Sequence, residues 1–258
     1  MKNKNRSFLS DDAVSEVVDF SITLGLMLLA IAIIGIAGYP MVEHMKETGH
    51  TENIRQSFSV LTPNMNKVVA GKAPSQSVEL KMHGGTISVT GNSYMNVTMH
   101  TWNASTSSYE AVSHERQLRM IKNEYKDTTV AYENTGAWAK YPLGRAVEIS
   151  KPVFAYDNSS MIIPMVTITG TNAISGSGLI RVISDGGHLS VESYRNVSRV
   201  EITLSSDYYQ AWENHLSESL GMHIIDVNTS TRTILAGKDY NPDIEVFITV
   251  SPMSVTVE

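Results

Sequence analysis

The pattern of hydrophobic and polar positions divides the chain into an apolar N-terminal segment and a longer segment of mixed polarity. Residues 20–39 form a run of 20 consecutive uncharged residues, FSITLGLMLLAIAIIGIAGY. A helix of this length rises about 30 Å, which matches the hydrocarbon core of a bilayer. An apolar surface on every side of a helix is uncommon in a soluble domain of this size. The run therefore predicts a transmembrane helix, with a buried core helix as the alternative.

A second helical pattern follows this run. Apolar residues recur at intervals of 4, 3, 4 and 3 and share one helix face; they are Ile54, Phe58, Leu61, Met65 and Val68. Such a stripe predicts a helix that packs on another apolar surface, here a sheet.

Glycines and prolines mark two places where this helical region could bend or be interrupted. Gly35, Gly38 and Pro40 lower helix propensity at the end of the apolar run, so a bend is expected there. Thr62 and Pro63 could either kink the amphipathic helix or begin a second one, with Thr62 as its N-cap.

After Gly71 the chain consists of short alternating or β-branched runs separated by turn residues, and no alternation of strands with helices appears. This pattern favours an antiparallel, sandwich-like arrangement over a parallel α/β fold. VELKMH and TISV, separated by Gly84 and Gly85, predict a hairpin. The predicted fold class is thus α+β, with a long N-terminal hydrophobic helix that continues as an amphipathic helix, followed by a mainly antiparallel β head.

One short helix is predicted within the head. Tyr208, Trp212 and Leu216 recur at intervals of four residues and share a face, and Gly221 is placed to end the helix. The stretch SMIIPMVTITGTNAISGSG predicts either two strands across a turn or a hinge between two β halves near residues 171–178.

The composition and the motifs of the chain exclude several classes of ligand and of catalytic site. Twenty basic and 26 acidic residues give a formal charge of −6, and no basic block occurs, so nucleic acid is not an expected partner. With no cysteine, disulfides, thiolate metal sites and thiol catalysis are excluded. The eight histidines lack metal-ligand spacing, and neither a nucleophile elbow nor a phosphate loop is present. We therefore predict no catalytic residue, no metal and no cofactor; a membrane-tethered hydrolase is the alternative, which requires carboxylates and histidine to cluster in the folded head.

Lys2, Lys4 and Arg6 precede the apolar run, whereas residues 41–50 carry mixed charge without a basic excess. The positive-inside rule then places the N-terminus in the cytoplasm and the head outside. A secretory signal peptide is the rival interpretation, because Gly35, Ala37 and Gly38 offer small residues for cleavage.

Five N-x-S/T sequons follow the apolar run and predict sites of N-glycosylation on an exposed head: Asn96, Asn103, Asn158, Asn196 and Asn228. Asn5 also fits the pattern but lies on the predicted cytoplasmic side.

The segment Asp12-Ala13-Val14-Ser15-Glu16, directly before the apolar run, resembles the class III signal peptide of archaeal type IV pilin-like proteins. AGYPMVEH, GGTISV and SSDYYQAW are similar to segments of an uncharacterised group of such surface proteins. The resemblance implies that a prepilin peptidase cuts between Ala13 and Val14. It also implies that other pilin-like subunits are partners, in addition to the lipid bilayer.

The resemblance and the pattern together divide the chain into four parts. Residues 1–13 are the leader peptide, 14–40 the transmembrane helix, 41–72 the amphipathic stalk, and 73–258 the extracytoplasmic head. Cleavage after Ala13 would create an α-ammonium on Val14, and the same amine of a neighbouring subunit could pair with Glu16 and set the register between subunits. Alternatively, Glu16 and Asp19 lie in the hydrated headgroup region.

The leading functional hypothesis is a pilin-like cell-surface structural protein, either a filament subunit or a minor pilin, whose head serves adhesion or surface contact. The alternative is an uncleaved single-pass membrane protein whose head binds cell-envelope components or glycans. Aromatic residues such as Trp102, Trp138 and Tyr141 could supply its binding platform, although packing in the core or between strands is the favoured explanation for them.

Overall fold

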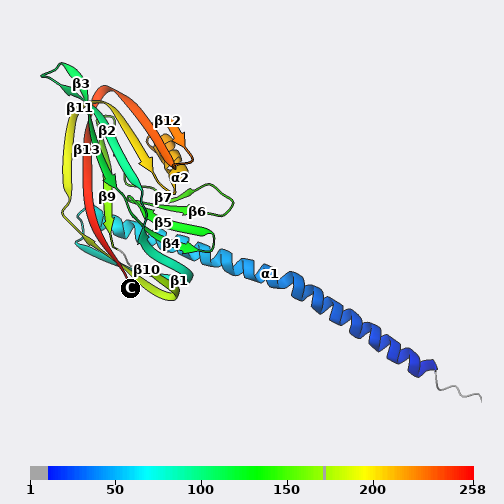
Figure 1. Cartoon of the computed structure of the whole chain (residues 1–258). Helices are drawn as coiled ribbons and strands as arrows, with labels where there is room; N and C mark the ends of the chain where they lie inside the picture. The colour runs from blue at the N-terminus through cyan, green and yellow to red at the C-terminus, as the bar shows by residue number, and fades with distance from the viewer. Residues whose placement is uncertain (1–10, 171–172) are drawn as a thin grey trace, which may run out of the picture. The chain divides into compact units, whose positions relative to one another are not determined.

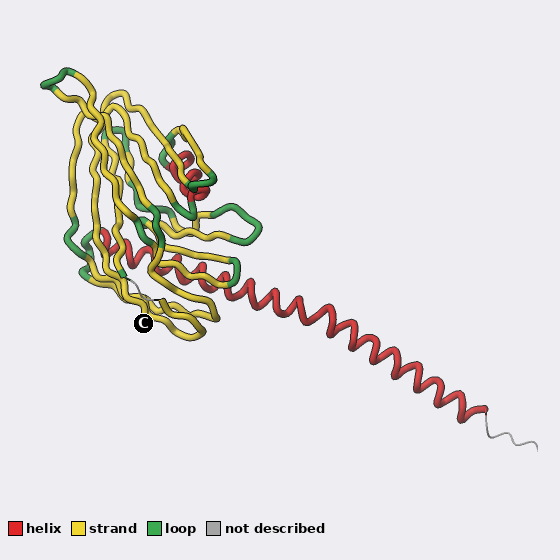
Figure 2. Tube along the Cα trace, viewed as in Figure 1, coloured by secondary structure: helices red, strands yellow, loops and turns green. Residues whose placement is uncertain are grey.

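The computed structural model describes residues 11–170 and 173–258 (Figure 1). The chain divides into two compact units, the first ending at Gly49 and the second spanning His50–Glu258. The first unit consists of the N-terminal part of helix α1 (Asp11–Val69). The second contains the rest of α1 and is built mainly of strands (Figure 2).

Helix α1 is a single helix of 59 residues that continues through both Pro40 and Pro63. Of the two alternatives for Thr62 and Pro63, the one in which Thr62 caps a second helix is wrong. Thr62 is buried within α1, and its hydroxyl donates a hydrogen bond to the Phe58 carbonyl at 2.8 Å, one turn earlier. The helix ends where Gly71 adopts a left-handed conformation (φ 67°) and Lys72 N donates to Lys67 O at 2.9 Å.

The remaining elements follow α1 in the chain. They are β1 (Ser75–Thr90), β2 (Tyr94–Asn103), β3 (Ser108–Gln117), β4 (Met120–Tyr125), β5 (Thr128–Glu133), β6 (Gly136–Lys140), β7 (Val147–Ser150), β8 (Ala155–Tyr156), β9 (Ser160–Thr169), β10 (Ala173–Gly186), β11 (Ser190–Ser205), α2 (Tyr209–Asn214), the π-helical turn η1 (His215–Ser219), β12 (His223–Asn228) and β13 (Thr233–Val257).

The described strands form one 13-stranded sheet with the order β3-β2-β11-β13-β10-β1-β4-β5-β6-β7. Strands β9 and β12 also pair with β13, and β8 pairs with β9. The pairing is antiparallel except between β13 and β9. The predicted α+β class and the mainly antiparallel head are therefore confirmed.

The hairpin predicted at Gly84 and Gly85 is wrong, because β1 is a single strand of 16 residues that runs through both glycines. They form a bulge, with φ values of 127° and 85°, and the register with β10 shifts between His83 and Thr86. A Cβ atom at Gly85 would lie 2.4 Å from the Glu124 carbonyl oxygen, so a side chain cannot be accommodated without movement. Two adjacent glycines thus bend a strand here instead of reversing it.

Two hydrophobic cores lie within the second unit. The helix core contains the stripe of α1, from Ile54 to Val68, packed against β1, β4, β10 and the end of β13, which confirms the predicted docking of this helix on a sheet. The sheet core is formed by β2, β9, β11, most of β13 and the short helix. Strand β13 serves both cores, with Val250 in the sheet core and Met253 in the helix core.

The predicted short helix is confirmed as α2 and η1. Tyr208, Trp212 and Leu216 are fully buried in the sheet core, and Gly221 follows with a φ of 62°. Residues 171 and 172, at the start of the predicted hinge, lie outside the described residues. From Ala173 onwards β10 pairs with β1, where Ala173 lies opposite Ser88.

Candidate functional site

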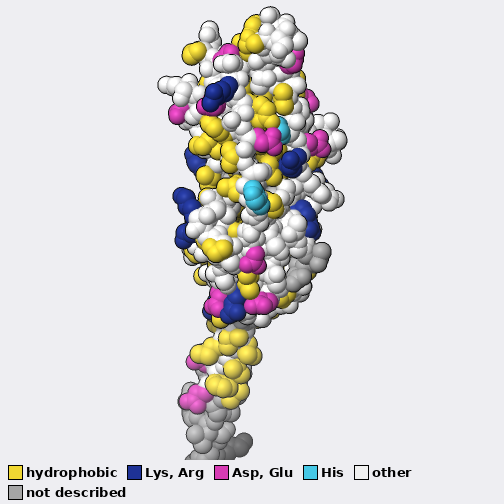
Figure 3. Space-filling model, turned by 90° about the vertical axis from the view of Figure 1, so that its left-hand side faces the viewer, with side chains coloured by type: hydrophobic (Ala, Val, Ile, Leu, Met, Phe, Trp, Pro, Cys, Tyr) yellow, Lys and Arg dark blue, Asp and Glu magenta, His cyan; other side chains and the backbone are white. Residues whose placement is uncertain are grey.

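The N-terminal half of α1 presents an extended apolar surface. No charged residue occurs between Asp19 and Glu43, and an 18-residue stretch with a mean hydropathy of 2.5 is wholly unburied within the chain. Ile34 and Ile36 are 70% and 78% exposed. Figure 3 shows hydrophobic side chains gathered along this helix, whereas charges of both signs are scattered over the visible face of the head. By length and composition, this helix could span a membrane.

The serine and threonine hydroxyls of residues 20–39 donate hydrogen bonds within their own helix. Ser21 Oγ donates to the Val17 carbonyl at 2.7 Å, and Thr23 Oγ1 donates to the Asp19 carbonyl at 2.9 Å. Such bonds allow serine and threonine to enter an apolar medium without an unpaired donor. Ser21 and Thr23 are therefore compatible with lipid or with a packed helix bundle.

The residues of the predicted leader junction lie at the start of α1. Ala13 and Val14 are helical, but their side chains, like residues 1–10 of the predicted leader, lie outside what the structure describes. Glu16 is exposed and forms no ion pair with any described residue. The pairing predicted for Glu16 involves another subunit and stays a prediction.

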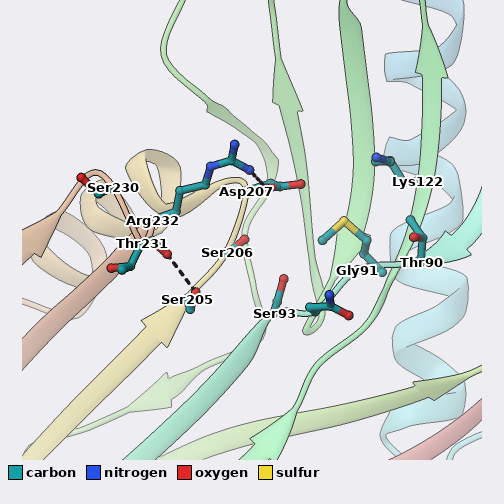
Figure 4. Close-up of a pocket in the computed structure, with 12 residues that line it drawn as sticks. Thr90, Gly91, Ser93, Lys122, Ser205, Ser206, Asp207, Ser230, Thr231 and Arg232 are labelled. Atoms are coloured by element: carbon teal, nitrogen blue, oxygen red, sulfur yellow. Dashed lines mark hydrogen bonds and ion pairs between the residues drawn. The ribbon is translucent and has the colours of Figure 1, made fainter.

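A polar pocket of about 430 Å³ opens in the head (Figure 4). Four segments line it: the connection from β1 to β2, strand β4, the end of β11, and the connection from β12 to β13. At its rim, Arg232 forms an ion pair with Asp207. Ser205 Oγ donates to the Thr231 carbonyl at 3.3 Å and links two of the segments. The pocket is thus held together by polar contacts between segments that are distant in sequence.

The carboxylate of Glu133 is buried beneath this pocket. Ser206, which lines the pocket, donates a hydrogen bond from Oγ to Glu133 Oε2 at 2.7 Å. Trp212 Nε1 donates to the same oxygen at 3.1 Å. Glu133 Oε1 has no hydrogen-bond partner among the described residues. Burial raises the pKa of Glu133, and the hydrogen bonds from Ser206 and Trp212 partly offset this effect.

Glu133 precedes a buried two-residue turn between β5 and β6. Asn134 and Thr135 have φ values of 45° and 70°, as a type I′ turn requires. Asn134 Oδ1 accepts a hydrogen bond from Val166 N at 2.9 Å, and the Thr135 carbonyl accepts one from Asn66 Nδ2 at 2.9 Å. The turn therefore ties β9 and α1 together between the two cores. The sequence signals for this turn are Glu133 at the end of the strand TTVAYE and the Asn134-Thr135-Gly136 segment that follows it.

His215 is a second buried titratable group, at the start of η1. Its Nδ1 lies 3.0 Å from Glu148 Oε2, and its Nε2 has no partner among the described residues. Trp138, Trp212 and Phe154 surround the ring, with centroids 6.4, 6.0 and 5.8 Å away. Burial lowers the pKa of His215, and Glu148 opposes this shift.

Among described residues no group of three potential metal ligands occurs.

The sequons differ in exposure. Asn158, Asn196 and Asn228 are exposed. Asn96 is half-buried within β2, between β3 and β11, and its Oδ1 is buried without a partner. Asn103 is half-buried, and its Nδ2 donates to Glu110 Oε2 at 2.8 Å.

The three aromatic residues proposed as a platform are not brought together as one. Trp138 is fully buried in the sheet core, and Tyr141 packs against the helix core. Trp102 is 43% exposed and forms an edge-to-face pair with Tyr109, with centroids 5.2 Å apart. For Trp138 the packing explanation is therefore confirmed and the platform is excluded, because its ring pairs with that of Trp212 inside the core.

Comparisons with known proteins give three findings. No solved structure matches the chain. A protein of Archaeoglobus fulgidus described as "Uncharacterized protein" is 31% identical over 77 residues, which are 30% of this chain and 25% of that protein. The chain thus aligns with only a quarter of that relative's length. The model of a family of unknown function, DUF7289, matches residues 13–256. Because this match covers both the apolar helix and nearly all of the head, the chain belongs to the DUF7289 family.

Proposed function

We propose that this protein is a pilin-like cell-surface structural protein, anchored by α1, with an extracytoplasmic head. The observation that carries the proposal is the division of α1 into two kinds of surface. The first half exposes apolar side chains on all sides, whereas the second half buries a single stripe in the helix core. A surface of the first kind needs lipid or the helices of other subunits around it.

The acidic residues at the start of α1 support assembly after processing. Glu16 and Asp19 are three residues apart on one helix and precede the uncharged run. In an apolar surrounding, an unpaired carboxylate costs about 2–3 kcal/mol. The α-ammonium of Val14 on a neighbouring subunit would neutralise Glu16 and fix the stagger of adjacent helices. The family match begins at Ala13, next to the proposed cleavage site, and includes the apolar helix.

The experiment that tests processing is the determination of the N-terminal residue and intact mass of the native protein from its own membrane fraction. A start at Val14 is expected and places the protein in the pilin-processing pathway. A start at Met1 would contradict cleavage and favour the uncleaved receptor. A start after Gly38 would mean secretion and overturn membrane anchoring.

Assembly is tested separately by a matched pair of substitutions. In the processed protein, Glu16→Gln should abolish or strongly reduce co-purifying oligomers, whereas Asp19→Asn, one turn away, should leave them in place. Cross-linking in membranes followed by mass determination reads out the oligomers. Equal behaviour of the two variants would overturn the role of Glu16 in register.

The second candidate is an uncleaved, single-pass protein whose head binds cell-envelope components or glycans. The half-exposed pair of Trp102 and Tyr109 favours it, because exposed aromatic rings offer an apolar surface beside hydrogen-bonding groups. Tyr109 also donates to Asp243 Oδ2 at 2.8 Å, which holds the ring in place.

A further inference from the structure

We propose that the polar pocket between β4 and the end of β11 binds a neutral saccharide. Its volume of about 430 Å³ falls within the range of about 300–1,000 Å³ that small-molecule sites occupy. Figure 4 shows side chains from separate segments facing one another, with Ser205, Thr231 and Arg232 on the left and Thr90, Gly91 and Lys122 on the right.

The lining offers free hydrogen-bonding groups of the kind that recognise hydroxyls. The side chains of Thr90, Asn92, Ser230 and Thr231 line the pocket, and none forms a side-chain hydrogen bond with another described residue. Hydroxyl groups and amides both donate and accept hydrogen bonds, as the hydroxyls of a sugar require. No aromatic residue lines the pocket in the described chain, so an apolar ligand has little surface to cover.

The charges favour a neutral ligand over an anion. Both cations of the pocket already have carboxylate partners, since Lys122 Nζ lies 3.2 Å from Glu124 Oε2 and Arg232 pairs with Asp207. Behind the floor lies a further carboxyl group, that of Glu133. A phosphate or carboxylate would therefore lie beside the carboxylates that already neutralise both cations, and their negative charge would repel it. A sugar can instead accept from the remaining guanidinium N–H groups of Arg232 and donate to Asp207.

The floor of the pocket is preorganised. Ser206 Oγ donates to Glu133 and accepts from Tyr208 N at 3.0 Å, and Ser206 N donates to the Arg232 carbonyl at 3.1 Å. Leu118 N donates to the Ser93 carbonyl at 2.7 Å, which fixes the opposite wall. Because these groups are held before a ligand arrives, binding requires little ordering.

The test uses the full chain in a zwitterionic detergent without a sugar headgroup, so that the detergent cannot occupy the pocket. Glucose, galactose, mannose and N-acetylglucosamine are titrated by calorimetry and ligand-observed NMR, alongside glucuronate and inorganic phosphate. At least one neutral sugar should bind with a dissociation constant on the order of 1 mM, as expected for a ligand of this size. Glucuronate and phosphate should bind at least about tenfold more weakly.

Two pairs of variants assign the binding to this pocket. Asn92→Ala and Ser230→Ala should each weaken binding about fivefold, the factor that one net hydrogen bond contributes. Asn158→Ala and Ser105→Ala remove the same groups from exposed loops outside the pocket and should leave binding unchanged. Near-ultraviolet circular dichroism confirms that each variant is folded.

Three results would overturn the proposal. They are no sugar binding up to about 50 mM, well above the expected range, a preference for the anions, and sugar binding that survives both pocket substitutions. The outcome is independent of the proposed pilin-like role, because leader cleavage and membrane insertion do not enter the titration.

Discussion

Trp212 Nε1 donates a hydrogen bond to Glu133 Oε2 at 3.1 Å, and both side chains are fully buried. Trp212 belongs to α2, whereas Glu133 ends β5, so this bond joins segments 79 residues apart. Ser206 donates to the same oxygen at 2.7 Å. One carboxyl group thus connects the short helix, the end of β11 and the buried β5–β6 turn.

Glu133→Gln should change how stability depends on pH. Because burial raises the pKa of Glu133 above its ordinary 4.5, its contribution to stability is fully present below pH 4.5 and is lost as the pH rises through the folded-state pKa. Glutamine resembles the protonated acid, so the variant should lack this loss. Urea unfolding between pH 4 and pH 8 should show a free energy of unfolding that falls less steeply for the variant than for the parent.

Glu133→Ala serves as the comparison. It leaves the donors of Trp212 and Ser206 unpaired, each at a cost of about 1–3 kcal/mol, and should destabilise the head at every pH. If the free energy of unfolding changed with pH to the same extent in Glu133→Gln and in the parent protein, the assignment of a raised pKa to Glu133 would be contradicted.

His215 should contribute a pH dependence of the opposite sign. Burial lowers its pKa below 6.5, so its contribution to stability is present above pH 6.5 and is lost as the pH falls through the folded-state pKa. His215→Gln should therefore remove part of the destabilisation seen on acidification below pH 6.5. His223→Gln, at an exposed position in β12, is the matched control and should leave the profile unchanged. The prediction would be refuted if the free energy of unfolding depended on pH in the same way in the parent, His215→Gln and His223→Gln.

The stripe of α1 should be essential to the stability of the head. Phe58 is fully buried in the helix core, and Phe→Ala substitutions at such sites cost about 3–5 kcal/mol. For a domain of this size, Phe58→Ala should lower the melting temperature by about 10 °C. Val60, on the same helix, is 55% exposed, and Val60→Ala should change the melting temperature only slightly. Thermal unfolding followed by near-ultraviolet circular dichroism measures both, and equal shifts would argue against docking of this face.

Membrane association should depend on the apolar half of α1. Ile31 is 66% exposed and lies near the middle of the uncharged run, where an arginine costs about 2.5–3.5 kcal/mol on insertion. Ile31→Arg should increase the fraction of protein released from membranes by alkaline carbonate. Ile225→Arg places the same charge at a 43% exposed position of the head and should stay in the membrane fraction. Equal release of both variants would exclude a specific role for the helix.

Glycan occupancy should follow the exposure of the sequons, given the proposed surface location. Asn228 accepts hydrogen bonds from Ser230 N and Thr231 N through Oδ1, which leaves its Nδ2 accessible. Asn158 and Asn196 are also exposed. Glycopeptide mass spectrometry of the native protein should therefore find occupancy at these three sites and none at Asn96. A glycan on Asn96 would require β2 to leave the sheet and would contradict the fold at this strand.

The sequence by itself determined the elements whose signals are local. The uncharged run and the stripe from Ile54 to Val68 predict helix because their periodicity is written in neighbouring residues, and both lie in α1. The short helix with Trp212 and the antiparallel character of the head follow from equally local patterns. Local signals failed at Gly84 and Gly85, because the same two residues fit either a turn or a bulge. Here they form a bulge, because β1 pairs with β10 on both sides of the two glycines.

The tertiary structure alone decided the sites. The pocket joins Asn92, Lys122, Asp207 and Arg232, and no spacing along the chain reveals that they meet. In the sequence, Trp138 fits either an exposed platform or a core, and only the packing of α2 against β6 places it beside Trp212. The physical reason is that hydrophobic periodicity is set by local backbone geometry, whereas a pocket or a buried carboxyl group depends on which strands the fold brings together.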